Sequence, residues 1–155
     1  MPTTRTRSPR LETGERIFIA HGRLVDVITA PGDPASSAAG RAGPRQSWRE
    51  VLLEGTLEGY LTGRWRIVLQ QRARRKGPVD AFSVGTVWTE DGPELSLFSE
   101  GLLTQRADGT ARVWQTVHLS TPDGAPPAWV SGLPIRADGI LDAGSATFTA
   151  NAYLL

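Results

Sequence analysis

The chain has 155 residues, of which 39% are hydrophobic, with 17 glycines, 11 prolines and a formal net charge of +1. This length is typical of a single domain, and the many turn-forming residues favour short strands joined by loops over long helices. The nearly balanced charge argues against a protein that mainly binds nucleic acid or an anionic membrane.

The absence of cysteine excludes disulfides, thiolate zinc sites and cysteine nucleophiles. Arg5, Arg7 and Arg10 are not followed by an apolar segment, so no secretory signal is predicted. No run of residues approaches the roughly 18 consecutive apolar residues that a membrane-spanning helix needs. The sequence therefore predicts a cytoplasmic protein.

Residues 1–14 are polar and are predicted to form a flexible N-terminal tail. The segment RIFIAHGRLVDVIT (16–29) is rich in β-branched residues and predicts a strand, with Gly22 at a bulge or bend. Residues 29–46, rich in Ala, Gly, Ser and Pro, predict a long loop. Two interpretations of this loop stay open: a disordered insertion, and a lid over a pocket.

The next three segments, 47–61, 63–75 and 80–90, alternate between two kinds of residue with a period of two. Trp65 and the apolar residues after it alternate with arginine and glutamine, and Trp88 belongs to a similar alternation. Period-two patterns of this length are typical of half-buried strands.

Two further strands are predicted at 94–106 and 111–121, joined by a turn at Asp108-Gly109, a typical hairpin pair. The chain closes with strand-forming residues at 139–155. No stretch of a dozen residues repeats with the helical period.

Seven or eight successive strands with short turns predict a closed up-and-down antiparallel barrel of about eight strands over residues 15–155. Such a calycin-like barrel, with little helix, leaves no unpaired edges. Gly55 and Gly59 share one strand face, where missing side chains allow sharp coiling or close approach of a neighbouring strand. The interior of such a barrel is either packed or just wide enough for one small ligand.

Glu54 and Glu58 lie about 13 Å apart along the predicted strand, too far for a pair of catalytic carboxylates. Each is therefore interpreted as a solvent-facing residue. The histidines, His21 and His118, lack metal-binding spacing, so no metal site is predicted. His118 shares a strand face with Trp114, which suits either a structural histidine or a pocket residue.

Six basic residues between Arg64 and Lys76 lie near Trp65, a pattern compatible with binding of single-stranded nucleic acid. A solvated strand end is the simpler interpretation, because the chain has no wider excess of basic residues.

Trp65, Trp88 and Trp114 fall in the middle of three different predicted strands, with Phe82 close to the same level. An apolar cavity with few polar groups is typical of ligand pockets. The alternative, in which these rings fill a solid core, stays open because several strands are apolar on both faces.

The pattern resembles the allene-oxide-cyclase-like and dirigent-like barrels, and is similar to small barrel cyclases of bacterial polyketide pathways, including spirotetronate-type Diels–Alderases. The likeness lies in EGTLEGYLTGRWRIVLQ (54–70), FSEGLLTQRADGTARVWQTV (98–117) and GSATFTANAYLL (144–155), together under half of the chain.

The resemblance implies a cyclase without metal or cofactor that closes a ring in a linear polyketide-type substrate by a Diels–Alder-like [4+2] reaction. Orientation of the reacting ends can remove roughly 7–11 kcal/mol of barrier, and a hydrogen bond to a substrate carbonyl would add to this. The expected catalytic residues are Tyr60, Gln71 and His118. The residues expected to bind substrate are Trp65, Phe82, Trp88 and Trp114.

Two other functions stay open: a non-catalytic carrier for a hydrophobic small molecule and, with less support, a single-stranded nucleic-acid binder. The expected partner is a hydrophobic small molecule, with neither nucleic acid nor a membrane. Barrels of this type often pair through an outer face, so a homodimer is compatible with the resemblance.

Overall fold

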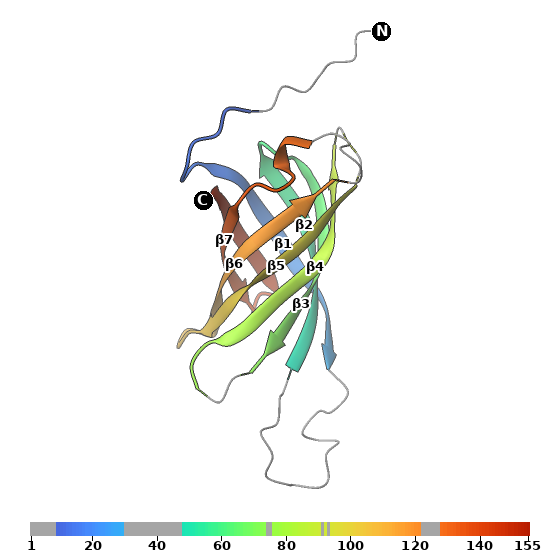
Figure 1. The fold of residues 1–155 in the computed structure, drawn as a ribbon. Coiled ribbons are helices and arrows are strands. Elements are labelled where there is room, and N and C mark those ends of the chain that lie inside the picture. The colour runs from blue at the N-terminus through green and yellow to red at the C-terminus, as the bar shows by residue number, and fades with distance from the viewer. Residues whose placement is uncertain (1–8, 30–47, 74–75, 91, 93, 122–127) are drawn as a thin grey trace, which may run out of the picture.

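The chain forms a closed antiparallel β-barrel of eight strands in sequential order, as the sequence predicts. The computed structural model describes residues 9–29, 48–73, 76–90, 92, 94–121 and 128–155. The strands, shown in Figure 1, are β1 (Arg16–Thr29), β2 (Trp48–Gly59), β3 (Gly63–Arg72), β4 (Val79–Thr89), β5 (Glu94–Gln105), β6 (Thr110–Ser120), β7 (Ile135–Asp142) and β8 (Thr147–Leu154).

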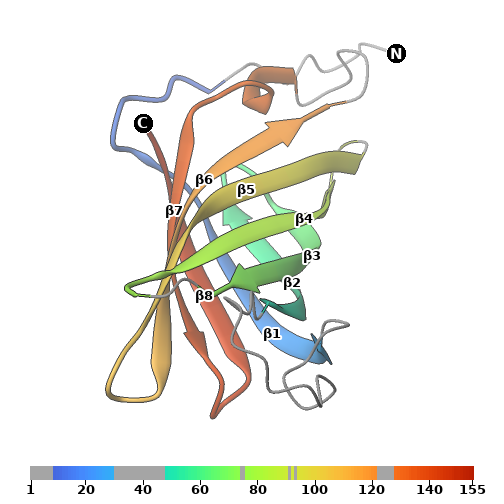
Figure 2. The same ribbon diagram turned by 60° about the horizontal axis from the view of Figure 1, so that its bottom comes forward.

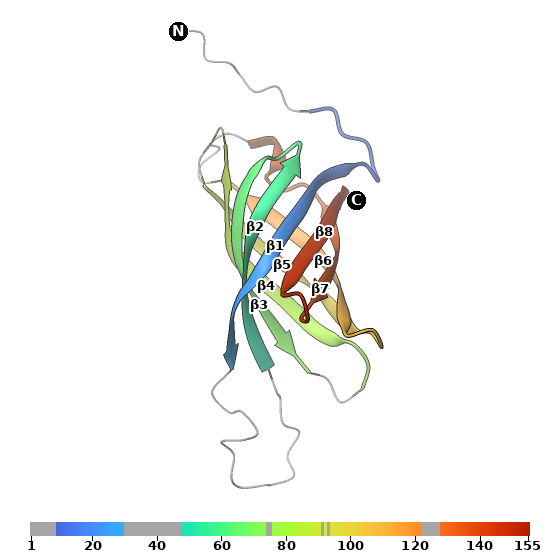
Figure 3. The same cartoon turned by 180° about the vertical axis from the view of Figure 1, so that it is seen from behind.

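Closure of the barrel joins β1 to β8, which lie side by side in Figure 3. The central part of this seam pairs Ala20 with Ala150 and Gly22 with Phe148. The closing segment predicted at 139–155 is in fact a hairpin of two strands, and its first strand begins earlier, at Ile135. Ala146 in the hairpin turn has a left-handed φ of 57°.

The irregularity predicted at Gly22 lies elsewhere in β1. Gly22 pairs regularly with Gly55, whereas the register between β1 and β2 shifts between Leu24 and Asp26, which leaves Val25 as the extra residue. A bulge needs one more residue than the facing strand, not a glycine, so the glycine was a misleading indicator of its position.

Gly55 and Gly59 are required by close approach of β1 to β2. A Cβ atom on Gly55 would overlap the backbone of His21 and Gly22, and one on Gly59 would lie 2.5 Å from the carbonyl oxygen of Ile17. The predicted role of these glycines in strand approach is therefore confirmed.

One half of the barrel interior is closely packed. Val51, Leu53, Leu69, Leu103 and Val113 fill the half nearer the turn between β5 and β6, and each is at most 2% exposed. At the opposite end lies the 3-10 turn η2 (Ala128–Val130), drawn between β6 and β7 in Figures 1 and 2. We call the half of the barrel beneath η2 the capped half.

Residues before β1 contact the barrel. Leu11 packs against the core, and the Gly14 amide donates a hydrogen bond of 2.7 Å to the Leu154 carbonyl. Residues 1–8 of the predicted tail, and the predicted loop from residue 30 on, lie outside the described residues. No helix in the described part of the chain is long and apolar enough to cross a bilayer.

Candidate functional site

The capped half contains a small apolar cavity of about 60 Å³, lined by residues from all eight strands. Trp65 and Phe148 form part of its wall, with ring centroids 5.9 Å apart and an edge-to-face angle of 75°. This volume is several times the roughly 10–15 Å³ that one water molecule requires. It is well below the roughly 300–1,000 Å³ typical of pockets for drug-sized ligands.

The residues beside Trp65 on β2 and β1 are glycines, which leave room for its indole ring in the cavity wall. Gly55 is its register partner on β2, and Gly22 follows on β1, so no side chain competes with the indole on that side. The indole Nε1 donates a hydrogen bond of 3.0 Å to the Thr56 carbonyl, which satisfies its one donor.

Three buried polar side chains, Ser83, Ser99 and Gln115, lie on the inner face of β4, β5 and β6, each at most 5% exposed. The Gln115 carboxamide nitrogen donates to the Ser83 hydroxyl at 3.1 Å and reaches the Ala81 carbonyl at 3.4 Å. Gln115 and Ser99 line the cavity. These residues form a polar strip in a wall that is otherwise apolar.

Ser99 differs from Ser83 in its hydrogen bonding. Ser83 and Ser99 are register partners on adjacent strands, but only Ser83 is bonded to Gln115. Ser99 is 1% exposed, and its side chain lines the cavity. A serine hydroxyl in the wall can donate to or accept from a polar group inside the cavity.

Among the residues that the structure describes, none that lines the cavity has an ionisable side chain. What the wall offers is apolar contact, a serine hydroxyl that can donate or accept, and a glutamine amide. This arrangement can bind and orient a small molecule.

The predicted site residues do not come together in this cavity. Trp65 lines it, as predicted. Gln71 also faces inward but lines a separate space of about 40 Å³ at the other end of the barrel, with Arg49 and Leu141. Tyr60 lies between β2 and β3, is 47% exposed, and donates a hydrogen bond of 2.6 Å to Glu15.

The prediction that four other residues face the cavity is wrong. Along β4 and β6, the alternation places these residues on the outer face of the barrel, and Trp114 is 42% exposed. The four residues are Phe82, Trp88, Trp114 and His118.

The error has a steric cause. Barrels of eight strands have limited interior volume, so small residues often face inward. On β4 the inward positions are Ala81, Ser83, Gly85 and Val87, and the aromatic side chains of this strand point out. This inner row was the signal that could have identified Ser83. On β5 and β6, Ser99 and Gln115 alternate in phase with buried apolar residues, which indicates their inward position.

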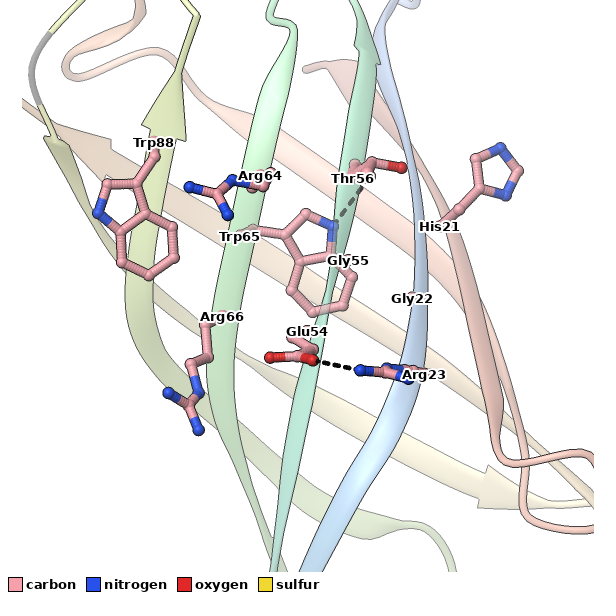
Figure 4. A pocket seen from close by; sticks show the side chains of 10 residues that line it. All are labelled: His21, Gly22, Arg23, Glu54, Gly55, Thr56, Arg64, Trp65, Arg66 and Trp88. Atoms are coloured by element: carbon pink, nitrogen blue, oxygen red, sulfur yellow. Dashed lines mark hydrogen bonds and ion pairs between the residues drawn. The ribbon is translucent and has the colours of Figure 1, made fainter.

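A second concavity lies on the outer surface of β1 to β4, as Figure 4 shows. This trough, of about 630 Å³, runs between two rows of outward side chains, with His21, Thr56, Arg64 and Trp88 in one row. Its other row includes Arg23, Glu54 and Arg66.

The trough is lined by three arginine side chains and is open to solvent. Arg23 donates to Glu54 at 2.9 Å, whereas Arg64 and Arg66 have no acidic partner among the described residues. Outward-facing arginines are readily solvated, so this surface is less specific than the interior cavity. Of the predicted basic run, residues 74 and 75 lie outside the described residues.

Across the described ranges, no group of three or more His, Cys, Asp or Glu side chains could hold a metal ion.

Solved structures of other proteins share this barrel, and three of them are described below. A β-barrel-like protein from Acinetobacter baumannii has a TM-score of 0.71 and 16% identity, covering 97% of this chain and 99% of its own. A conserved protein of unknown function from Rhodopseudomonas palustris has a TM-score of 0.65 and 16% identity over 94% and 98% of the two chains.

The third structure, a protein of unknown function from Clostridium acetobutylicum, has a TM-score of 0.64 and 12% identity over 93% of this chain and 99% of its own. No protein-family model matches the sequence, and no curated protein matches it. Likeness at these identities shows the fold alone.

Proposed function

We propose that this barrel binds a small, mainly apolar molecule carrying one hydrogen-bonding group, inside the capped half. The observation that carries the proposal is the presence of two buried polar side chains, Ser99 and Gln115, in an otherwise apolar cavity wall. A ligand with one hydrogen-bonding group can pair with one of them while its apolar part contacts the rest of the wall.

The size of the cavity sets the size of the ligand. At about 60 Å³, the space suits a compact molecule of a few non-hydrogen atoms, or one ring if the wall relaxes slightly. A ligand of this kind would contact Trp65 and Phe148 with its apolar part and Ser99 or Gln115 with its polar group.

Paired ligands test this proposal. Phenol and toluene have nearly the same shape, but phenol carries a hydroxyl where toluene carries a methyl group, so phenol should bind more tightly. Isotope-edited NMR would follow the Trp65 indole N–H and the Gln115 side-chain amide during titration with each ligand. Shifts at these two groups that saturate are expected, and their absence with both ligands would contradict the proposal.

Two variants of the same strand make the test specific. Ser99→Ala should weaken phenol binding toward that of toluene, whereas Ser96→Ala, on the outer face of β5, should leave it unchanged. Ala137→Leu, which fills part of the cavity, should abolish binding of both ligands. An equal effect of the two serine substitutions would reject the role given to Ser99.

Ring closure of a linear polyketide-type substrate stays a prediction. With no ionisable residue in the described part of the wall, such a reaction would depend on orientation and on hydrogen bonds from Ser99 or Gln115. A linear polyketide would also require the barrel to widen. Product formed from a linear polyene above the uncatalysed rate would support a cyclase, and return of unchanged ligand would support a carrier.

A cytoplasmic location likewise stays a prediction, which cell fractionation would test.

A further inference from the structure

The outer face of the barrel carries a row of apolar side chains that crosses several strands. Val68 on β3, Val84 on β4 and Phe98 on β5 are register partners, and Leu52 on β2 continues the row. Val84 is 60% exposed and Phe98 is 44% exposed. Antiparallel sheets usually present polar residues on the face away from the core, so this row is unusual.

The row belongs to a wider apolar surface. Phe82 lies beside Val84 on the same face of β4, and Leu102 on β5 pairs with Trp114 on β6, which is 42% exposed. Contiguous exposed apolar side chains on a water-facing surface mark an interaction site. Because the barrel is closed, no strand edge is free for pairing, so a partner must pack on a strand face.

Two charged residues flank the centre of this surface at opposite corners. Arg66 is the outward neighbour of Val68 on β3, and Glu100 is the outward neighbour of Phe98 on β5. Val84 lies midway between them, because its register partners are Val68 and Phe98. Both charges are exposed, and neither has an ion-pair partner within the described residues.

We propose that a second copy of this chain packs on this face, related by a two-fold axis through Val84. The axis lies in the interface, perpendicular to the line from Arg66 through Val84 to Glu100. Each Arg66 then faces Glu100 of the other copy, and the two charge pairs flank an apolar centre. A surface that is complementary to itself in this way is what an isologous dimer requires.

The spacing of the sheet fits this arrangement. With strands about 4.8 Å apart and about 3.4 Å per residue along each strand, Arg66 and Glu100 lie about 8 Å on either side of Val84. This distance leaves room for apolar contacts at the centre and keeps the charges at the rim, where they direct orientation and partner choice.

The first test is sedimentation of the full chain over a series of protein concentrations. A reversible dimer is expected, and Val84→Glu should convert it to a monomer with an unchanged melting temperature, because Val84 is exposed in the single chain. A wild-type chain that stays monomeric up to millimolar concentration would overturn the proposal. So would a dimer that Val84→Glu leaves intact, because another face would then hold it together.

Charge reversal tests the two-fold arrangement itself. Arg66→Glu or Glu100→Arg alone should raise the dimer dissociation constant roughly ten-fold or more, because each change places two like-charge pairs at the interface. The double variant should restore dimerisation. Glu58→Arg, on the exposed outward side of β2 and away from this face, is the matched control and should have no effect. A double variant as weak as either single one would overturn the proposed pairing.

Discussion

The indole of Trp65 occupies the space in which a side chain at Gly22 would begin. A Cβ atom on Gly22 would lie 2.5 Å from Cζ2 and 2.6 Å from Cη2 of Trp65, and 2.7 Å from the Glu54 carbonyl oxygen. Glycine at this position of β1 therefore allows a tryptophan from β3 to lie across the inner surface of β2. The cavity wall depends on this contact between strands that are not adjacent.

Gly22→Ala is expected to destabilise the fold by about 1–3 kcal/mol, the usual cost of overpacking a rigid interior. Equilibrium denaturation with urea would measure the loss. In a Trp65→Phe background the same substitution should cost less, because phenylalanine lacks the two clashing ring atoms. An equal loss of unfolding free energy in both backgrounds would show that the Glu54 carbonyl oxygen, and not the indole, limits the space for a side chain at residue 22.

The two register-paired serines should respond to a different degree to the same substitution. Ser83→Ala leaves the Gln115 amide without its shortest hydrogen bond and is expected to lower the free energy of unfolding by about 1–3 kcal/mol. Ser99→Ala removes a hydroxyl that is not bonded to Gln115 and should lower the free energy of unfolding by less than Ser83→Ala does. Denaturation of the ligand-free protein measures both, and a large loss for Ser99→Ala would reveal a bonded hydroxyl.

Ala146→Gly is expected to stabilise the protein by about 0.5–1 kcal/mol. Ala146 has a φ of 57°, a left-handed conformation that glycine adopts without the steric cost of a Cβ atom. Ala143→Gly in the same turn is the control and should give no gain, since it lacks a left-handed φ. Differential scanning calorimetry would compare the two, and equal shifts would contradict the explanation.

The hydrogen bond from Tyr60 lowers the pKa of Glu15 below its ordinary value of 4.5, with a further contribution from the Glu12 backbone. A carboxyl group with a lowered pKa in the folded state stabilises the fold above its unfolded pKa. This contribution is lost as the pH falls through the folded value. The contact between the segment before β1 and the β2–β3 connection should therefore weaken in acid. It should also weaken in strong base, where Tyr60, whose pKa the hydrogen bond to Glu15 raises, loses the proton that it donates.

Tyr60→Phe should return the pKa of Glu15 toward 4.5 and remove this part of the acid dependence of the melting temperature. An NMR titration of the Glu15 side-chain carboxyl carbon would measure the change directly. Asp108, whose pKa is lowered mainly by the Thr110 hydroxyl, is an internal reference that Tyr60→Phe should not affect. An unchanged Glu15 titration would show that the Glu12 amide dominates.

Much of the barrel could be predicted from local pattern because closure of an antiparallel meander depends on strand count and short turns. β1 begins and ends where predicted, at residues 16 and 29, and the β5–β6 turn forms at Asp108-Gly109, where Gly109 has a φ of 87°. These features depend on neighbours in the sequence, so the sequence carries them directly.

The identity of the inner face was decided only by the tertiary structure. Period-two alternation separates two faces of a strand but does not say which one faces inward when both carry apolar residues. On β4 the limited interior volume selects Ser83 and its small neighbours for the inside, which turns Trp88 outward. The cavity was likewise invisible in the sequence, because Trp65, Ser99 and Gln115 meet only when closure brings distant strands around one space.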